Sequence, residues 1–304
     1  MILDRTKVYL RSGSGGEGDS TLMSISSRKL KAYGGDGGKG GDVIIKISPH
    51  LYDLSKFRGS KKFIASNGTR GGANNKKGQN AGNLIVSVPE GTRVIWQDKV
   101  IADLNGPEKE FLICRGGAGG KGNYKRNYTV APGLGEEKEV TLDYRIPNEV
   151  ALVGMSNAGK SSLFNALTGQ NQKVADYPFT TRSCLWAGSE YNFKVFRVMD
   201  TPPVKVKKEN SQIQENDFLR HLFRSRIVIV VGDEIQSWKK DLEAVKEETS
   251  LYDIGVLKEK KFFYLLNKID KIDVNLIPKG VLAVSAKSGQ GMDILKKQIV
   301  EYLY

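Results

Sequence analysis

Glycine is distributed unevenly along the chain, and its clusters constrain the fold more than any other feature of the sequence. Of 34 glycines, 25 lie in residues 1–148. They gather at residues 13–18, 34–41, 71–72 and 116–122. A collagen triple helix is excluded because glycine does not recur at every third residue. Only glycine fits where two backbones approach closely. We therefore expect several segments to pack side by side in a polyproline-II-like conformation, with ordinary loops as the alternative.

Short β-type runs separate the clusters, whereas a flexible glycine-rich linker would lack them. The runs occupy residues 43–47, 84–88, 94–96, 100–102 and 111–113. They are apolar, and Gly, Pro, Asn or Asp residues lie between them, which is typical of short strands joined by turns. The first half of the chain is therefore predicted to combine strands with glycine-rich segments.

The second half alternates strand-type and helix-type segments. Strands are predicted at 149–153, 193–199, 227–231, 262–266 and 281–284, and helices at 160–167, 217–223, 238–247 and 293–302. This alternation predicts an α/β domain whose parallel sheet is covered by helices on both faces. With a boundary at Pro147, the chain comprises a glycine-rich domain of residues 1–147 and an α/β domain of residues 148–304. No further domain is expected after the closing helix.

The chain is basic, with 47 Lys and Arg against 34 Asp and Glu and a formal net charge of +13. Residues 1–148 hold 24 of the basic and 15 of the acidic residues, so most of the excess lies in the glycine-rich half. Such an excess favours a polyanionic partner, nucleic acid first. A basic surface that only aids solubility is the alternative.

Several classes of protein are excluded by composition. No stretch approaches the roughly 18 apolar residues of a membrane span. The only cysteines are Cys114 and Cys184, and there are 2 histidines, so neither a disulfide framework nor a zinc site is expected. The start of the chain does not resemble a secretory signal. We expect an intracellular protein, with bacterial cytoplasm, mitochondrion and another organelle left open.

The chemistry of the second half begins with a phosphate-binding pattern. G-x-x-x-x-G-K-S is formed by Gly154, Met155, Ser156, Asn157, Ala158, Gly159, Lys160 and Ser161. The pattern lies between a predicted strand and a predicted helix, as a P-loop requires. Its backbone N–H groups would cradle phosphates at the helix N-terminus. Lys160 would reach the β- and γ-phosphates, and the Ser161 hydroxyl would bind Mg²⁺.

Three further patterns follow in order, each at the end of a predicted strand. Asp200 is expected to hold Mg²⁺ through water. Asn267, Lys268 and Asp270 match N-K-x-D, in which the carboxylate accepts hydrogen bonds from guanine N1–H and N2–H₂ that adenine lacks. Ser285, Ala286 and Lys287 would close over the base. Because ligands of open α/β sheets bind at this edge, the sequence predicts a guanine-nucleotide site and disfavours an ATPase.

One more segment lies between the phosphate loop and Asp200. It has the sequence ADYPFTT and ends with Phe179, Thr180 and Thr181. We expect these residues to take part in nucleotide binding. A threonine hydroxyl here is a candidate second Mg²⁺ ligand when the γ-phosphate is present.

Together, these segments resemble the Obg family of GTPases over nearly the whole chain. The resemblance is carried by DRTKVYLRSGSGGEG, GGDGGKGGDVI, NLIVSVPEGT, VIADL and RGGAGGKGN, and by LVGMSNAGKSSLFNALTG, KVADYPFTT, DTPP and DFLRHLFRS. It implies glycine-rich polyproline-II-like helices on a small β-barrel, followed by a Ras-like P-loop GTPase domain. It also implies that Ser161 and Thr181 bind Mg²⁺, and that Asn267, Lys268 and Asp270 read guanine.

The resemblance further implies a role in assembly of the large ribosomal subunit. The glycine-rich domain would insert its loops into ribosomal RNA near the peptidyl transferase centre. Basic residues that suit such contacts are Lys61, Lys62, Arg70, Lys76, Lys77, Lys121, Lys125 and Arg126. Contacts to phosphate would be salt-sensitive. For several of these residues the alternative is an ordinary solvated charge. We expect a monomer that binds the large subunit or its precursor.

The sequence departs from the family pattern next to the predicted magnesium site. The family's D-x-P-G is D-T-P-P here, so Pro203 replaces a glycine whose N–H contacts the γ-phosphate. Val204 follows, so no glutamine is present there to orient water. The resemblance suggests slow hydrolysis of GTP that is assisted by potassium and stimulated by the ribosome, with Asn157, Lys160 and Thr181 as the catalytic set. For Asn157, an ordinary loop residue is the alternative.

Two other functions stay open at this point. The chain could be a catalytically weak RNA scaffold that holds GTP or GDP, because Pro203 replaces the switch glycine. It could also be a signalling GTPase with a protein partner, which predicts no salt-sensitive binding to RNA.

Overall fold

The computed structural model describes residues 3–27, 29–59, 61–106, 109–169, 184–204, 213–250, 260–278 and 280–304. The chain forms two compact units. Leu3–Tyr144 make up the first, here called the glycine-rich unit, and Arg145–Tyr304 the second, here called the nucleotide unit.

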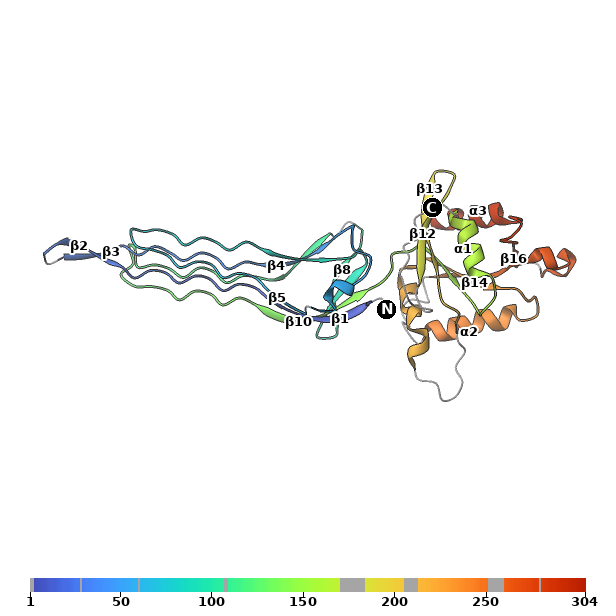
Figure 1. The fold of residues 1–304 in the computed structure, drawn as a ribbon, viewed down its shortest axis with the longest axis horizontal. Coiled ribbons are helices and arrows are strands. Elements are labelled where there is room, and N and C mark those ends of the chain that lie inside the picture. Colours follow the sequence, from blue (N-terminus) through green and yellow to red (C-terminus); the bar gives the residue numbers. More distant parts are fainter. Residues whose placement is uncertain are drawn as a thin grey trace. The chain divides into compact units, whose positions relative to one another are not determined.

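Strands of the glycine-rich unit form two sheets and a separate hairpin (Figure 1). The larger sheet has the order β5-β1-β10-β7-β8, the smaller one β6-β4-β9, and β2 pairs with β3. Their bounds are β1 Arg5–Arg11, β2 Leu22–Ser26, β3 Lys29–Ala32, β4 Val43–Ile47, β5 Lys62–Ile64, β6 Leu84–Val88, β7 Thr92–Trp96, β8 Lys99–Leu104, β9 Glu110–Cys114 and β10 Glu137–Tyr144. The predicted runs coincide with β4 and β6 and lie within β7, β8 and β9, whereas the other strands of this unit were not predicted from the sequence.

The glycine clusters run as extended segments between these sheets and the β2–β3 hairpin (Figure 1). Glycine N–H groups bond to glycine carbonyls of neighbouring segments, for example Gly16 to Gly38 at 2.9 Å and Gly37 to Gly120 at 2.8 Å. A Cβ atom at Gly37 would lie 1.9 Å from the carbonyl oxygen of Gly16. Neither Gly16 nor Gly37 has a positive φ. Glycine is therefore required by lack of space, which confirms the predicted backbone packing.

A partly buried carboxylate, that of Asp42, fixes two of these segments to each other. The Lys39 ammonium lies 2.8 Å from both oxygens of Asp42, and the Gly116 N–H donates to Asp42 Oδ1 at 2.7 Å. The hydrogen bond from Lys39, followed by that from Gly116, holds the pKa of Asp42 below its ordinary value. Asp42 is therefore more acidic in the folded protein than in the unfolded chain.

This shift predicts a loss of stability in acid. Below the usual aspartate pKa of about 3.9, the unfolded chain takes up a proton more readily than folded Asp42 does. The glycine-rich unit should thus lose stability as pH falls through that value towards the lower folded pKa. Denaturant unfolding as a function of pH should show a weaker acid-induced loss for Asp42→Asn. Asp98→Asn, at an exposed turn, is the control; an unchanged profile for Asp42→Asn would contradict the assignment.

The nucleotide unit is built on a six-stranded sheet with the order β12-β13-β11-β14-β15-β16. The strands are β11 Val150–Val153, β12 Leu185–Tyr191, β13 Lys194–Asp200, β14 Ile227–Gly232, β15 Lys261–Leu266 and β16 Leu282–Ala283. All neighbouring pairs are parallel except β12–β13. The expected parallel sheet is therefore present, and β12, which was not predicted, adds an antiparallel strand at its edge.

Helices cover both faces of the sheet. They are α1 Lys160–Thr168, α2 Trp238–Ser250 and α3 Met292–Leu303, together with the 3₁₀ helices η2 Ile213–Arg224, η4 Ile269–Lys271 and η5 Val274–Leu276. The segment predicted as a helix at 217–223 lies in η2, which is 3₁₀ rather than α. Successive residues of β15 face opposite ways: the Phe263 ring contacts Tyr302 of α3, and the Tyr264 ring contacts Trp238 of α2.

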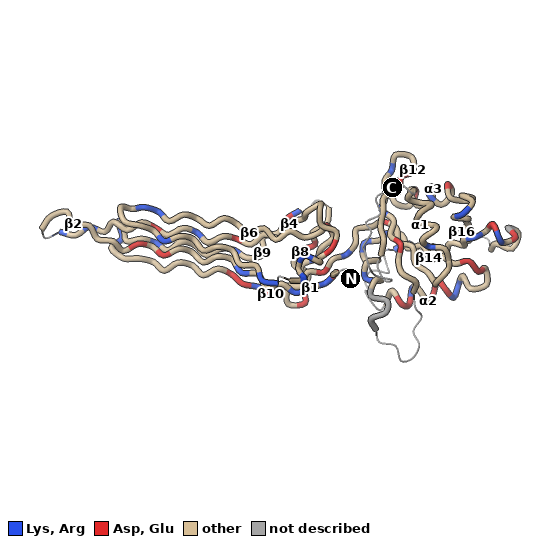
Figure 2. Tube along the Cα trace, viewed as in Figure 1, with Lys and Arg blue, Asp and Glu red and all other residues tan. Residues whose placement is uncertain are grey.

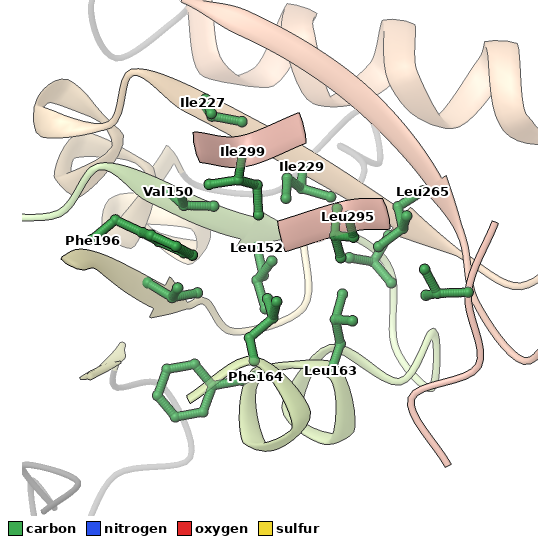
Figure 3. Packing of buried hydrophobic residues seen from close by; sticks show 14 of the residues in the cluster. Val150, Leu152, Leu163, Phe164, Phe196, Ile227, Ile229, Leu265, Leu295 and Ile299 are labelled. Atoms are coloured by element: carbon green, nitrogen blue, oxygen red, sulfur yellow. The ribbon is translucent and has the colours of Figure 1, made fainter. Parts of the chain in front are cut away.

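The main core of the nucleotide unit lies on the α1 and α3 side of the sheet (Figure 3). Leu152 of β11 and Leu163 of α1 are fully buried there, and Leu295 of α3 is 1% exposed. Because Leu163 and Phe164 lie one helical turn after Lys160 on α1, burial of this helix fixes the position where the phosphate-binding segment enters it. No helix in the described part of the chain combines the length and apolarity needed to cross a membrane.

Candidate functional site

The predicted phosphate loop leaves β11 at Val153 and enters α1 at Lys160. Gly159 has φ +83°, which favours glycine, and a Cβ atom there would lie 2.3 Å from Asn267 Nδ2. A Cβ atom at Gly154 would lie 2.3 Å from the carbonyl oxygen of Val231. Both glycines of the motif are therefore required by neighbouring strands and loops of this unit.

Lys160 is 6% exposed and its ammonium turns back onto the loop. Its Nζ donates to the carbonyl oxygens of Gly154 at 3.0 Å and Met155 at 2.8 Å. Burial lowers the pKa of Lys160, and the nearby carboxylate of Asp200 opposes that shift. The ammonium is thus held at the mouth of the loop, where phosphate groups would replace or join its carbonyl partners.

Asp200, at the end of β13, lies directly beside Ser161. The Ser161 hydroxyl donates to Asp200 Oδ2 at 2.7 Å, and Asp200 is 6% exposed. Burial raises the pKa of Asp200, while the hydrogen bond from Ser161 and the charge of Lys160 act against that rise. Because burial disfavours the charged form of Asp200, a nearby cation would stabilise its carboxylate.

These two residues fit the requirements of Mg²⁺. The second oxygen of Asp200, Oδ1, is buried and has no hydrogen-bond partner among the described residues. A hydroxyl and a carboxylate are the hard oxygen ligands that Mg²⁺ prefers. Phe179, Thr180 and Thr181, also expected at the nucleotide and the metal, lie outside the described residues.

The predicted guanine-reading segment connects three loops. Asn267 Nδ2 donates to the carbonyl oxygen of Ala158 at 3.1 Å, and the Ala286 N–H donates to Asn267 Oδ1 at 3.2 Å. Lys268 Nζ donates to the carbonyl oxygen of Asn157 and to Asp233 Oδ2, both at 2.6 Å. The amide of Asn267 therefore binds the phosphate loop to the segment at 285–287.

Asp233 was missed by the sequence analysis. It follows β14, the fully apolar strand at 227–232, so its position at the same sheet edge was the available signal. Its carboxylate pairs with Lys268, which has a positive φ of 63°. A positive φ is uncommon for a residue other than glycine, so the backbone of this motif is strained at Lys268.

Asp270 is positioned by the last of the predicted patterns. Ser285, which is fully buried, donates its hydroxyl to Asp270 Oδ1 at 2.6 Å. This hydrogen bond holds the pKa of Asp270 below its ordinary value, so the side chain is a carboxylate at neutral pH. Lys287 is exposed nearby, and its charge acts in the same direction. A carboxylate held in this way can accept two hydrogen bonds from one edge of a base.

A pocket of about 720 Å³ lies over the phosphate loop. It is lined by Ser156, Asn157, Gly159, Lys160, Ser161, Ser162, Leu185, Asp200, Thr201, Pro202, Pro203 and Lys268. Pro203 is exposed, and the next residue, Val204, donates its N–H to the carbonyl oxygen of Gly154 at 3.1 Å. The D-T-P-P segment is thus bonded to the phosphate loop immediately after the proline.

A phosphate loop, a buried carboxylate and an N-K-x-D loop at one edge of a mainly parallel sheet define a P-loop GTPase. The family model described as "GTP1/OBG" matches residues 3–144, and the model described as "50S ribosome-binding GTPase" matches residues 149–268. The chain belongs to the Obg family of GTPases and is a GTP hydrolase.

Bacterial relatives resemble the chain over its whole length. The GTPase Obg of Thermoanaerobacter sp. (strain X514) is 33% identical, with 100% of this chain and 78% of that protein aligned. The GTPase Obg of Thermodesulfovibrio yellowstonii is 34% identical, with 99% of this chain and 97% of that protein aligned. Among solved structures, the G domain of the T. maritima FeoB iron transporter covers 52% of this chain and 100% of that chain at 27% identity, with a TM-score of 0.37.

Proposed function

We propose that this chain is a Mg²⁺-dependent GTPase that acts in assembly of the large ribosomal subunit and docks on ribosomal RNA through its glycine-rich unit. The observation that carries the proposal is the buried Asp200 oxygen next to Ser161 and Lys160, which has no hydrogen-bond partner among the described residues, in a chain of net charge +13. The ribosome-binding description of the matching family model supports the same partner.

The residues have separate roles in this proposal. Gly154 to Ser161 bind the phosphates, Asn267, Lys268 and Asp270 bind the base, and Ser161, Asp200 and Thr181 hold the metal ion. Bound Mg²⁺ would neutralise charge on the β- and γ-phosphate oxygens. Asn157 is exposed at the pocket, where we propose that it helps to hold a potassium ion.

The basic residues expected at loop tips lie in two places. Lys61 and Lys62 lie beside β1, since Lys62 is in register with Tyr9. The others lie towards the β2–β3 end, where several form ion pairs: Arg70 with Asp19, and Lys121 and Arg126 with Asp36. The residues that remain for RNA contacts at that end are Lys76, Lys77 and Lys125.

Co-sedimentation with ribosomal subunits tests the proposal directly. We expect the protein to bind a large-subunit particle with a non-hydrolysable GTP analogue and to be released with GDP. Equal binding in both states would instead support a scaffold that holds the nucleotide structurally. Absence from every subunit fraction at low salt would contradict the proposal and favour a signalling GTPase.

Pro203 gives a separate test of catalysis. If lack of an N–H at this position limits hydrolysis, Pro203→Gly should raise the single-turnover rate by about tenfold or more, since one transition-state donor is worth roughly 10²–10³ in rate. Pro202→Gly, next to it in the same pocket, is the control. An unchanged rate in Pro203→Gly would show that the proline is not the block.

A further inference from the structure

The glycine-rich unit contains a second basic site, away from the β2–β3 hairpin. A pocket of about 450 Å³ is lined by Leu3, Arg5, Thr6, Lys7, Arg58, Lys61 and Thr141. Four of these residues are cations and none is acidic. Figure 2 shows Lys and Arg positions on the trace of β1, the strand that contains Arg5 and Lys7. Concave surfaces lined by one sign of charge concentrate the opposite charge.

The backbones that carry these cations are fixed. Arg5 and Lys7 alternate with buried residues on β1, so both point outward. Lys7 is in register with Thr141 of β10. On the other side of β1, the carbonyl oxygen of Lys61 accepts the N–H of Tyr9 at 2.7 Å, and the N–H of Arg58 bonds to Ser55 at 3.0 Å. The charges are therefore brought together by the fold and not by chance contact of loops.

Within the described part of the chain, Arg5, Lys7 and Lys61 form no ion pair. The carboxylates of β10 nearest to Arg5 and Lys7 in the strand register are Asp143 and Glu139. Asp143 is opposite Arg5, is 2% exposed and is also in register with Arg93 of β7, and Glu139 is opposite Tyr9 and exposed. Like charges held around one hollow repel each other, and an anion that enters the hollow relieves that repulsion. The pocket is therefore suited to a ligand that carries several negative charges.

The lining also indicates which anion fits. Threonine hydroxyls and basic side chains bind phosphate oxygens. Among the described residues, no aromatic ring or side-chain amide lines the pocket and Leu3 is its only large apolar residue, so the lining offers charge and hydroxyl groups but no ring on which a base would stack. We propose that this pocket binds the phosphodiester backbone of RNA, as a second, sequence-independent contact of the glycine-rich unit. The inference rests on the proposed function, because it needs RNA as the partner.

Salt dependence of RNA binding tests this site. The full-length protein, with a GTP analogue bound, is titrated with naked large-subunit ribosomal RNA at several salt concentrations. Lys7→Glu with Lys61→Glu should lower the slope of log affinity against log salt by about 2, since each lost phosphate contact removes about 1. Lys99→Glu with Lys109→Glu makes the same change in net charge at exposed positions outside the pocket and should leave the slope nearly unchanged. Lys7→Gln with Lys61→Gln repeats the test without new negative charge.

Lys76→Glu with Lys77→Glu separates this inference from the proposed function. If only that variant weakens binding, the pocket is not an RNA site, while the proposed function stands. If the unaltered protein does not bind the RNA at all, the proposed function itself fails. Pyrophosphate is the small-anion probe. A further outcome is that the double variant Lys7→Glu with Lys61→Glu loses pyrophosphate binding while its slope of log RNA affinity against log salt stays unchanged. That result would assign the pocket to a free polyphosphate and overturn the RNA assignment.

Discussion

Replacing Gly37 by alanine is expected to destabilise the glycine-rich unit by about 3 kcal/mol or more, near the upper end of measured overpacking effects. The new Cβ would lie 1.9 Å from the carbonyl oxygen and 2.4 Å from the carbonyl carbon of Gly16. Gly16 cannot move aside, because its N–H bonds to Gly38 and its carbonyl accepts the N–H of Gly120. Relief of the clash must therefore break hydrogen bonds between three segments.

Gly82→Ala is the matched control. Nothing lies within 4 Å of a Cβ atom at Gly82, and its φ is not positive. Alanine there should be neutral or stabilise by about 0.4–1 kcal/mol, through the lower entropy of the unfolded chain. Equal effects of the two substitutions would mean that the glycine-rich segments are not closely packed.

Thermal unfolding with and without GDP measures both variants. The two compact units are expected to give separable transitions. GDP should raise the transition of the nucleotide unit, because a ligand stabilises only the unit that binds it. The transition that GDP does not raise therefore reports on the glycine-rich unit, and Gly37→Ala should lower that one.

The glycine pattern predicted close packing but not which segments pack together. Glycine has no side chain, so the spacing of apolar residues does not indicate which segments lie beside a glycine-rich one. Segment 13–18 bonds to segments 34–41 and 116–122, which are far away in the chain. The long strand β10 was missed because its first residues, Glu137, Lys138 and Glu139, are charged, and an apolar alternation begins only at Val140.

The site was more predictable, because each of its parts is a short continuous motif at the end of a strand. A parallel sheet brings such ends to one edge, so the order of the motifs was enough to predict that they meet. The features that could not be predicted from the sequence lie between the motifs. Strand β12 contains Gly188, Ser189 and Glu190, which interrupt any apolar period. Phe193, predicted as the start of a strand, has φ +61° in a turn and is 96% exposed.

Replacing Asp270 by asparagine is expected to lower affinity for GDP by about 10²-fold or more. Two hydrogen bonds from guanine to a carboxylate would be affected, and bonds to charged groups contribute roughly 1.5–3 kcal/mol each. Asparagine keeps one acceptor oxygen but presents an NH₂ donor to the guanine N2–H₂, so one bond is replaced by a clash of donors. Xanthosine diphosphate, which has a carbonyl in place of that amino group, should gain affinity.

Asp273→Asn is the control, since it makes the same change three residues further on, where the carboxylate accepts only from Asn275 among the described residues. Binding of GDP, xanthosine diphosphate and ADP by equilibrium titration distinguishes the outcomes. An unchanged preference for GDP in Asp270→Asn would mean that Asp270 does not read the base. Loss of affinity for all three nucleotides would indicate damage to the fold, which is not expected because the side chain is exposed and asparagine can still accept the Ser285 hydroxyl. Because the Ser285 hydroxyl also positions the Asp270 carboxylate, Ser285→Ala should weaken GDP binding in the same direction but less, without the gain of xanthosine diphosphate.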